Sequence, residues 1–243
     1  MLDDGRETMG PALPGDDRDA FVRALAQLSA ATGANTDLCG PFVDAMHVTG
    51  GAVSTLGRPL GNQTVCASSA VAARIDEIQI DLGEGPCWEA LRTRRPVLER
   101  DLRHHGGDAW PGAREALRQL DVHALFAFPL FVGALDVGVV DLYSTTPREL
   151  TPADVQDATV LASITARLVL RRALETVDDT AEDVAPGPYS QREVHQATGM
   201  VAAQLKVGAD DAFVVLRGHA FATGRSVREV ASDVVSRRTT FEP

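Results

Sequence analysis

Apolar residues recur at two spacings along the chain, and each spacing predicts a kind of element. Between Phe21 and Ala31 they fall three and four residues apart, which predicts an amphipathic helix, and helices are also predicted at 37–47, 69–80, 86–94 and 113–120. Runs of apolar and β-branched residues bounded by turn residues predict five strands, at 51–56, 64–68, 96–100, 124–132 and 137–143. Five strands mixed with helices on one core predict an α+β fold.

The segment Thr151-Pro152-Ala153-Asp154 marks the start of a long helix. A threonine hydroxyl can accept from a free amide, proline suits the first helical position, and an acid is favoured near the positive end of the helix dipole. The stripe of Leu161, Ile164 and Leu168 is compatible with packing on the sheet at one end and on a second chain at the other. We therefore expect a homodimer.

Two segments are too polar to join a packed core. Residues 1–16 are rich in Asp, Gly and Pro and predict a disordered tail, and residues 177–188 hold four acids and two prolines and predict a linker. The chain then divides into a larger domain at 17–176, which ends in the long helix, and a smaller domain at 189–243.

The smaller domain has the pattern of three helices. The segments 190–193 and 226–229 each begin with serine and end with glutamate, which fits the capping box at a helix start. Gly208 and Gly224 are expected to end the first and second helices. These signals predict an all-α module of three helices.

Composition and charge narrow the class of protein. The 243 residues are 44% hydrophobic and 23% charged, which is typical of a globular protein and excludes fibrous and disordered classes. No apolar run approaches the roughly 20 residues of a membrane-spanning helix, and the acidic start lacks a signal peptide, so we expect a cytoplasmic protein. The net charge of −11 is uneven, with +1 on the smaller domain and −12 on the preceding residues. A nucleic-acid surface is therefore expected on the smaller domain.

The cysteines do not form a recognisable framework. Cys39, Cys66 and Cys87 are odd in number and unequally spaced, which argues against both a set of disulfides and a zinc site. We expect each of them to be buried, and we expect no metal or cofactor.

Several ordered motifs of the larger domain resemble those of the GAF domain family. They are the run from Leu82 to Leu91 with its Gly-Glu-Gly-Pro-Cys-Trp sequence, then Arg95-Pro96-Val97, Phe128-Pro129-Leu130 and the run from Gly138 to Tyr143. The resemblance implies an antiparallel sheet with helices on both faces and a small-molecule pocket beside the glycine-rich turn. The residues expected to line this ligand pocket are Gly85, Cys87, Trp88, Phe126 and Phe128.

The smaller domain resembles the ANTAR family. The resemblance rests on the run from His195 to Val201, on Asp211-Ala212-Phe213 with Leu216-Arg217, and on the run from Val230 to Val235. It implies a module that binds RNA hairpins in nascent transcripts and prevents termination, and the domain order is that of GAF-ANTAR regulators common in actinobacteria. We therefore expect a ligand-responsive transcription antitermination regulator and not an enzyme.

The expected RNA-binding residues combine polar and basic side chains of the smaller domain. Gln196, Thr198 and Gly199 are expected near the RNA loop or backbone, although many ANTAR domains have lysine where this chain has Thr198. Glycine inside a helix is unfavourable by roughly 1 kcal/mol relative to alanine, so Gly199 suggests the close approach of a neighbouring helix or a phosphate. Phosphate contacts are expected from Arg192, Lys206, Arg217, Arg225 and Arg228.

Three alternatives remain open at this stage. The larger domain could be a cysteine-dependent methionine sulfoxide reductase, with Cys87 at a helix start as the nucleophile. The smaller domain could be a helix-turn-helix for DNA, although its third helix offers few basic residues for a major groove. It could instead be a module for protein interaction or dimerisation.

Overall fold

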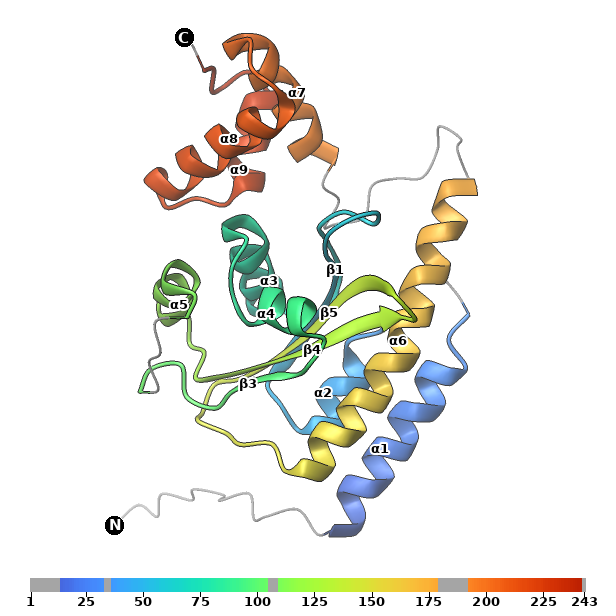
Figure 1. Ribbon diagram of the computed structural model, residues 1–243. Helices are drawn as coiled ribbons and strands as arrows, with labels where there is room; N and C mark the ends of the chain where they lie inside the picture. Colours follow the sequence, from blue (N-terminus) through green and yellow to red (C-terminus); the bar gives the residue numbers. More distant parts are fainter. Residues whose placement is uncertain (1–13, 33–35, 105–108, 179–191, 242–243) are drawn as a thin grey trace, which may run out of the picture.

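The computed structural model describes residues 14–32, 36–104, 109–178 and 192–241 (Figure 1). Its larger domain is built on a five-stranded sheet in the order β2-β1-β5-β4-β3, with every neighbouring pair antiparallel. The strands are β1 (Gly50–Thr55), β2 (Gln63–Ala67), β3 (Val97–Glu99), β4 (Ala124–Val132) and β5 (Leu135–Ser144). The predicted α+β fold is confirmed.

Helices cover both faces of the sheet. The helices α1 (Pro14–Ser29), α2 (Gly40–Met46) and α6 (Pro152–Asp178) cover one face, and α3 (Ala70–Leu82), α4 (Pro86–Thr93) and α5 (Pro111–Arg118) cover the other (Figure 1). Side chains alternate along β4, so that Phe126 and Phe128 pack beneath α1 and α6 while Leu125 and Ala127 pack beneath α3 and α4. The strand is therefore buried on both sides.

The local sequence predicts the start of α6 but not that of α1. The Thr151 hydroxyl accepts from the Asp154 amide at 3.2 Å and the Asp154 carboxylate accepts from the Thr151 amide at 2.8 Å, which confirms the predicted start of α6. Helix α1 begins at Pro14, inside the tail predicted at 1–16, and the rest of that predicted tail lies outside the described residues. No helix in the described part of the chain is long and apolar enough to cross a membrane.

The smaller domain is a three-helix module with its own core. Its helices are α7 (Arg192–Leu205), α8 (Ala209–Thr223) and α9 (Val227–Val235), and their inner faces form a separate apolar cluster. The capping box of Ser226 and Glu229 is confirmed, as is the left-handed Gly224 after α8. The predicted capping box at 190–193 and most of the predicted linker lie outside the described residues.

The role predicted for Gly208 is wrong. Lys206, with φ at 57°, is the left-handed residue that follows α7, whereas Gly208 has an extended conformation and precedes α8 as its N-cap. A lysine in this conformation carries no sequence signal, because the left-handed region is normally occupied by glycine or asparagine.

The prediction that the cysteines form no disulfide is wrong, although Cys39 is buried as expected. Cys39, the residue before α2, forms a disulfide with Cys66 of β2, with 6.4 Å between the Cα atoms. Their sequence separation of 27 gave no indication of pairing, because the fold alone brings α2 to this edge of the sheet. The Asp37 carboxylate lies beside the two sulfurs and accepts from the Cys39 and Gly40 amides. Cys87 is free and buried, as expected.

Candidate functional site

A cluster of polar side chains lies buried between the sheet and α3. Asp76 accepts from the Ser54 hydroxyl at 2.8 Å and from the Thr64 hydroxyl at 2.5 Å. The Gln79 side chain donates to Asp141 of β5 at 2.6 Å, and its Oε1 accepts from the Cys87 amide at the start of α4. The cluster therefore links β1, β2, β5, α3 and α4.

The cluster favours protonated carboxyl groups. Burial raises the pKa of Asp76 to about 6, and burial together with the charge of Asp76 raises the pKa of Asp141 well above its ordinary value. Oδ1 of Asp141 is buried and has no hydrogen-bond partner among the described residues. An unpaired buried oxygen is costly, so this atom is a candidate contact for a donor group of a ligand.

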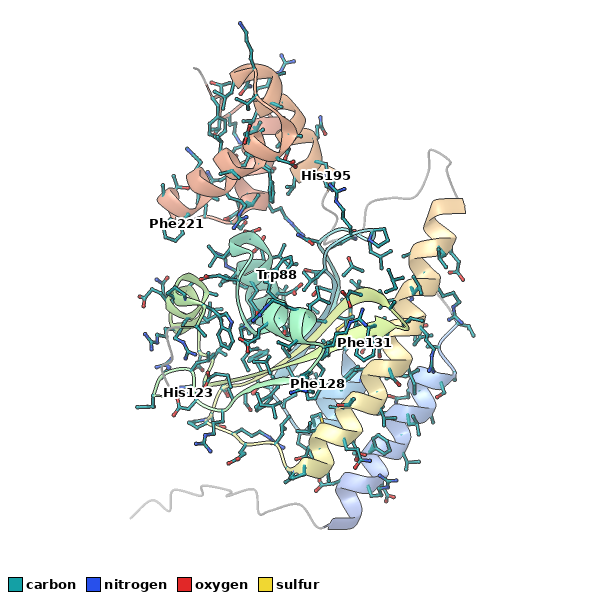
Figure 2. All side chains as sticks on the ribbon, viewed as in Figure 1. Trp88, His123, Phe128, Phe131, His195 and Phe221 are labelled. Carbon is teal, nitrogen blue, oxygen red and sulfur yellow. A yellow bond between two sulfur atoms is a disulfide. The ribbon has the colours of Figure 1, made fainter. Side chains whose placement is uncertain are left out.

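Three of the predicted pocket residues lie together at the glycine-rich turn. Gly85 has φ at 134°, and a Cβ there would lie 2.6 Å from Oε1 of Gln79, so only glycine fits. Cys87 is fully buried at the start of α4, and the Trp88 indole donates to the backbone carbonyl of Gln79 at 2.7 Å. Trp88 is labelled in Figure 2. Gly85 and Trp88 line a cavity of about 450 Å³, together with Glu84, Arg92, Arg94, Trp110 and other residues.

The other two predicted pocket residues lie elsewhere. Phe126 and Phe128 are fully buried on the opposite face of the sheet, in the core beneath α1, α2 and α6. The structure therefore does not bring them together with Gly85, Cys87 and Trp88. The cause is the two-residue period of β4, which turns Ala127 and not the phenylalanines toward α4.

The predicted RNA-binding residues of α7 form one group. Gln196, Gly199 and Lys206 are exposed, whereas Thr198 is half-buried and its hydroxyl donates to the Val194 carbonyl at 2.7 Å. A Cβ on Gly199 would meet nothing within 4 Å among the described residues, so packing inside the chain does not require this glycine. Arg192 begins α7, and its side chain lies outside what the structure describes.

The predicted arginines of α8 and α9 form a second group. Arg217 donates to the Leu82 carbonyl at the end of α3, at 2.5 Å, and is half-buried. Arg225 pairs with Asp233 at 2.7 Å, and Arg228 is half-buried in α9. The structure thus places Gln196, Gly199 and Lys206 on or directly after α7, whereas Arg217 and Arg225 line the cavity beside the larger domain.

Sequence reasoning missed three features of these sites. Asp141 had a signal, because it is an acid within an otherwise apolar run of β5 and shares one face of that strand with Val139 and Tyr143. Asp81 and Phe221, which line the cavity between the two domains, had none, because an acid or an aromatic residue near the end of a helix does not by itself indicate a domain contact. Their position depends on how the domains contact each other.

The arrangement defines the class of protein, a small-molecule sensor domain joined to a helical output module. Residues 42–170, more than half of the chain, match the GAF domain family, and the chain belongs to that family. Residues 189–235 match the ANTAR domain family and coincide with α7, α8 and α9. No curated protein matches the chain.

Solved structures share the fold of the larger domain. The GAF domain of a phosphoenolpyruvate-protein phosphotransferase from Coxiella burnetii is 12% identical, with a TM-score of 0.54 over 68% of this chain and 99% of that one. The corresponding Acinetobacter domain is 12% identical, with a TM-score of 0.50 over 70% of this chain and 100% of that one. The chromophore-binding domain of the bacteriophytochrome RpBphP3 from R. palustris is 13% identical, with a TM-score of 0.51 over 70% of this chain and 64% of that one.

Proposed function

We propose that this chain is a cytoplasmic transcription antitermination regulator whose GAF domain responds to a small molecule and whose ANTAR domain binds hairpins in nascent RNA. The observation that carries the proposal is the ANTAR module, with its own three-helix core, directly after a GAF domain. Unpaired loop bases present their edges to side chains, whereas duplex RNA hides them in a narrow groove, which suits a small module of this kind.

The ligand site is proposed at the glycine-rich turn, where Gly85, Cys87 and Trp88 lie together. The adjoining cavity of about 450 Å³ has aromatic, acidic and basic walls, which suits a small polar molecule with a ring. A reductase reaction at Cys87 has less support. Burial and the charges of Asp141 and Asp76 raise the pKa of the Cys87 thiol well above its ordinary value, and a protonated thiol is a poor nucleophile.

A homodimer is proposed through α1 and α6. Val22 and Val160 are exposed on these helices, and Leu174 is exposed near the end of α6. A second copy covering these side chains would place two ANTAR domains in one particle. Two linked domains bind two hairpins with an avidity that one domain lacks. Ligand binding would act by shifting the population in which both domains can engage RNA.

The test is an electrophoretic shift assay with an RNA that carries two hairpins and with a duplex DNA of the same sequence. We expect a shift with the RNA only, and native mass spectrometry should report a dimer. Lys206→Ala should weaken the RNA complex, whereas Arg95→Ala, which removes an exposed arginine from the GAF domain, should not. A shift with the DNA alone would instead identify a DNA-binding module, and a shift with neither would favour a module for protein interaction.

A further inference from the structure

One face of α8 combines apolar side chains with an arginine. Val214, Arg217 and Phe221 lie three and four residues apart and therefore share this face. Val214 is 63% exposed and Phe221 is 73% exposed. Figure 2 shows Phe221 at the end of α8 that is directed toward the GAF domain. We call this surface, defined by Val214, Arg217 and Phe221, the α8 face.

The α8 face is held against the GAF domain by polar contacts. Arg217 donates to the Leu82 carbonyl at 2.5 Å, and the Val227 amide at the start of α9 donates to the Asp81 carboxylate at 2.9 Å. Between the two domains lies a cavity of about 660 Å³. Its walls are α3, α5, α8 and the start of α9, and include Ile78, Leu82, Ala116, Val214 and Phe221.

This contact does not bury the apolar part of the α8 face. Covering a phenylalanine side chain is worth about 1.5–3 kcal/mol, so a permanent domain interface would be expected to close on Phe221. The ring instead stays exposed beside a cavity, and the hydrogen bonds of Arg217 and Asp81 join the domains next to it. The α8 face therefore has the composition of a surface that takes another occupant when the domains separate.

The charge of this surface favours a nucleic acid as the occupant. The ANTAR residues 189–243 carry +1 in a chain of net charge −11. Arg217 donates to a carbonyl and not to a carboxylate, so a phosphate could replace that acceptor with a stronger charge-assisted bond. An exposed aromatic ring next to an arginine is the combination on which unpaired bases stack.

We propose that the α8 face is a binding site for an unpaired base of the RNA loop, with the base stacked on Phe221 and the adjoining phosphate bound by Arg217. The inference rests on the RNA-binding function proposed above and assigns part of that binding to Phe221 and Arg217. Because Arg217 is occupied by Leu82 in the docked arrangement, the RNA and the GAF domain compete for the α8 face. Docking is then a state in which the phosphate contact of this site is unavailable to RNA.

The experiment measures binding of a fluorescent pool of RNA hairpins with randomised loops to the full chain, by anisotropy. Phe221→Ala should weaken binding about 5- to 150-fold, the range of one lost base stack at tenfold per 1.4 kcal/mol. Phe221→Tyr keeps the ring and should recover most of that loss. Phe131→Ala is the matched control, because Phe131 is 42% exposed on β4 of the GAF domain and should not contribute.

Competition is tested with a variant that opens the docked arrangement. Asp81→Lys replaces the acceptor of the Val227 amide by a cation near Arg217, and should raise RNA affinity about 2- to 10-fold, the range of one hydrogen bond. Glu149→Lys makes the same charge change at an exposed site and should raise the RNA affinity less than Asp81→Lys does. Hydrogen exchange at the Val227 amide should become faster in Asp81→Lys alone.

Two results would overturn the inference. Unchanged affinity in Phe221→Ala, with the wild-type chain binding the pool, would remove the base site while leaving the proposed function standing. Equal affinities for Asp81→Lys and Glu149→Lys would remove the competition. If the wild-type chain binds no hairpin in the pool, the proposed function fails and the site fails with it.

Discussion

At the scale of single residues, the buried carboxyl of Asp76 makes the stability of the GAF domain depend on pH. Burial raises its pKa from 3.8 to about 6, so the folded chain holds a proton that the unfolded chain releases between these values. The stabilising contribution is complete below the unfolded value and is lost as the pH rises through the folded one. The wild-type domain therefore carries the cost of a buried charge at neutral pH.

Asp76→Asn should remove this cost. The amide can still accept from Ser54 and can donate to Thr64, so we expect the variant to be more stable by about 1–3 kcal/mol at about pH 8, with the difference fading toward about pH 4. Urea unfolding at both pH values measures this, and Asp44→Asn, at an exposed site, is the control. A gain that is the same at both pH values would contradict the explanation.

The disulfide between Cys39 and Cys66 should stabilise the fold through the unfolded chain. In the chain-entropy model, closing a loop between residues 27 apart in the sequence raises the free energy of the unfolded chain by about 3–4 kcal/mol. We therefore expect a reductant to lower the denaturation midpoint of the wild-type chain but not that of a variant in which both cysteines are serine. Thiol titration of the chain unfolded without a reductant should find Cys87 alone, because this buried thiol becomes accessible only on unfolding. Three titratable thiols, or an unchanged midpoint, would show that the bond is absent under those conditions.

Residue identity was predictable from the sequence where the reason is local. Gly85 is required by its own backbone conformation, and the motif around it indicated as much. Cys39 and Cys66 meet only because two elements distant in sequence pack together, and Phe128 is directed away from the proposed pocket because of the register of its strand. These positions depend on tertiary packing, which cannot be predicted from the spacing of residues along the chain.

At the scale of elements, the start of α9 depends on the capping box. The Ser226 hydroxyl accepts from the Glu229 amide at 3.1 Å, and the Glu229 carboxylate accepts from the Ser226 amide at 2.8 Å. Ser226→Ala should reduce the stability of this helix by about 1 kcal/mol, seen as faster hydrogen exchange in its first turn. Ser236→Ala, at the opposite end of α9, should leave that turn unchanged. Equal exchange in both variants would mean that docking, and not the cap, holds the first turn.

The elements themselves were largely predictable, because turn and cap residues mark their ends. All five strands and the helices from α2 to α9 appear near their expected positions, and Gly224 ends α8 in the left-handed conformation. Two boundaries differ from this rule. Lys206 adopts the conformation expected of a glycine, and α1 starts before the first apolar stripe, so in neither place does a sequence signal coincide with the boundary.

At the scale of the whole molecule, the domain contact was not predictable. Hydrogen bonds of this contact join a backbone carbonyl of α3 to an arginine and a carboxylate of α3 to a backbone amide of α9. Backbone groups at helix ends are present in every sequence, so such a contact leaves no characteristic residue pattern. The sequence predicted two domains, and only the structure indicates that one of them covers part of the other's arginine-bearing surface.

The same contact should respond to pH through Asp81. Burial raises its pKa to about 7 in the docked arrangement, and separation of the domains would return it toward the ordinary value of 3.8. The docked state therefore binds an extra proton between these values, so docking strengthens as the pH falls from about 7 and weakens as the pH rises through that value. The charged groups around this carboxyl are Glu77 and Arg74 on α3 and Arg217 on α8, with Glu115 and Arg225 on the cavity walls.

Hydrogen exchange at the Val227 amide, corrected for its intrinsic pH dependence, reports the docked fraction because this amide donates to Asp81. We expect its protection to increase by less than tenfold per unit as the pH is lowered from about 8 to about 6, since one proton sets an upper limit of tenfold and the cavity admits water. Asp81→Asn cannot titrate and should keep constant protection over this range. Protection that rises equally in both proteins would assign the response to another group, and Glu77 would be the next carboxyl to replace.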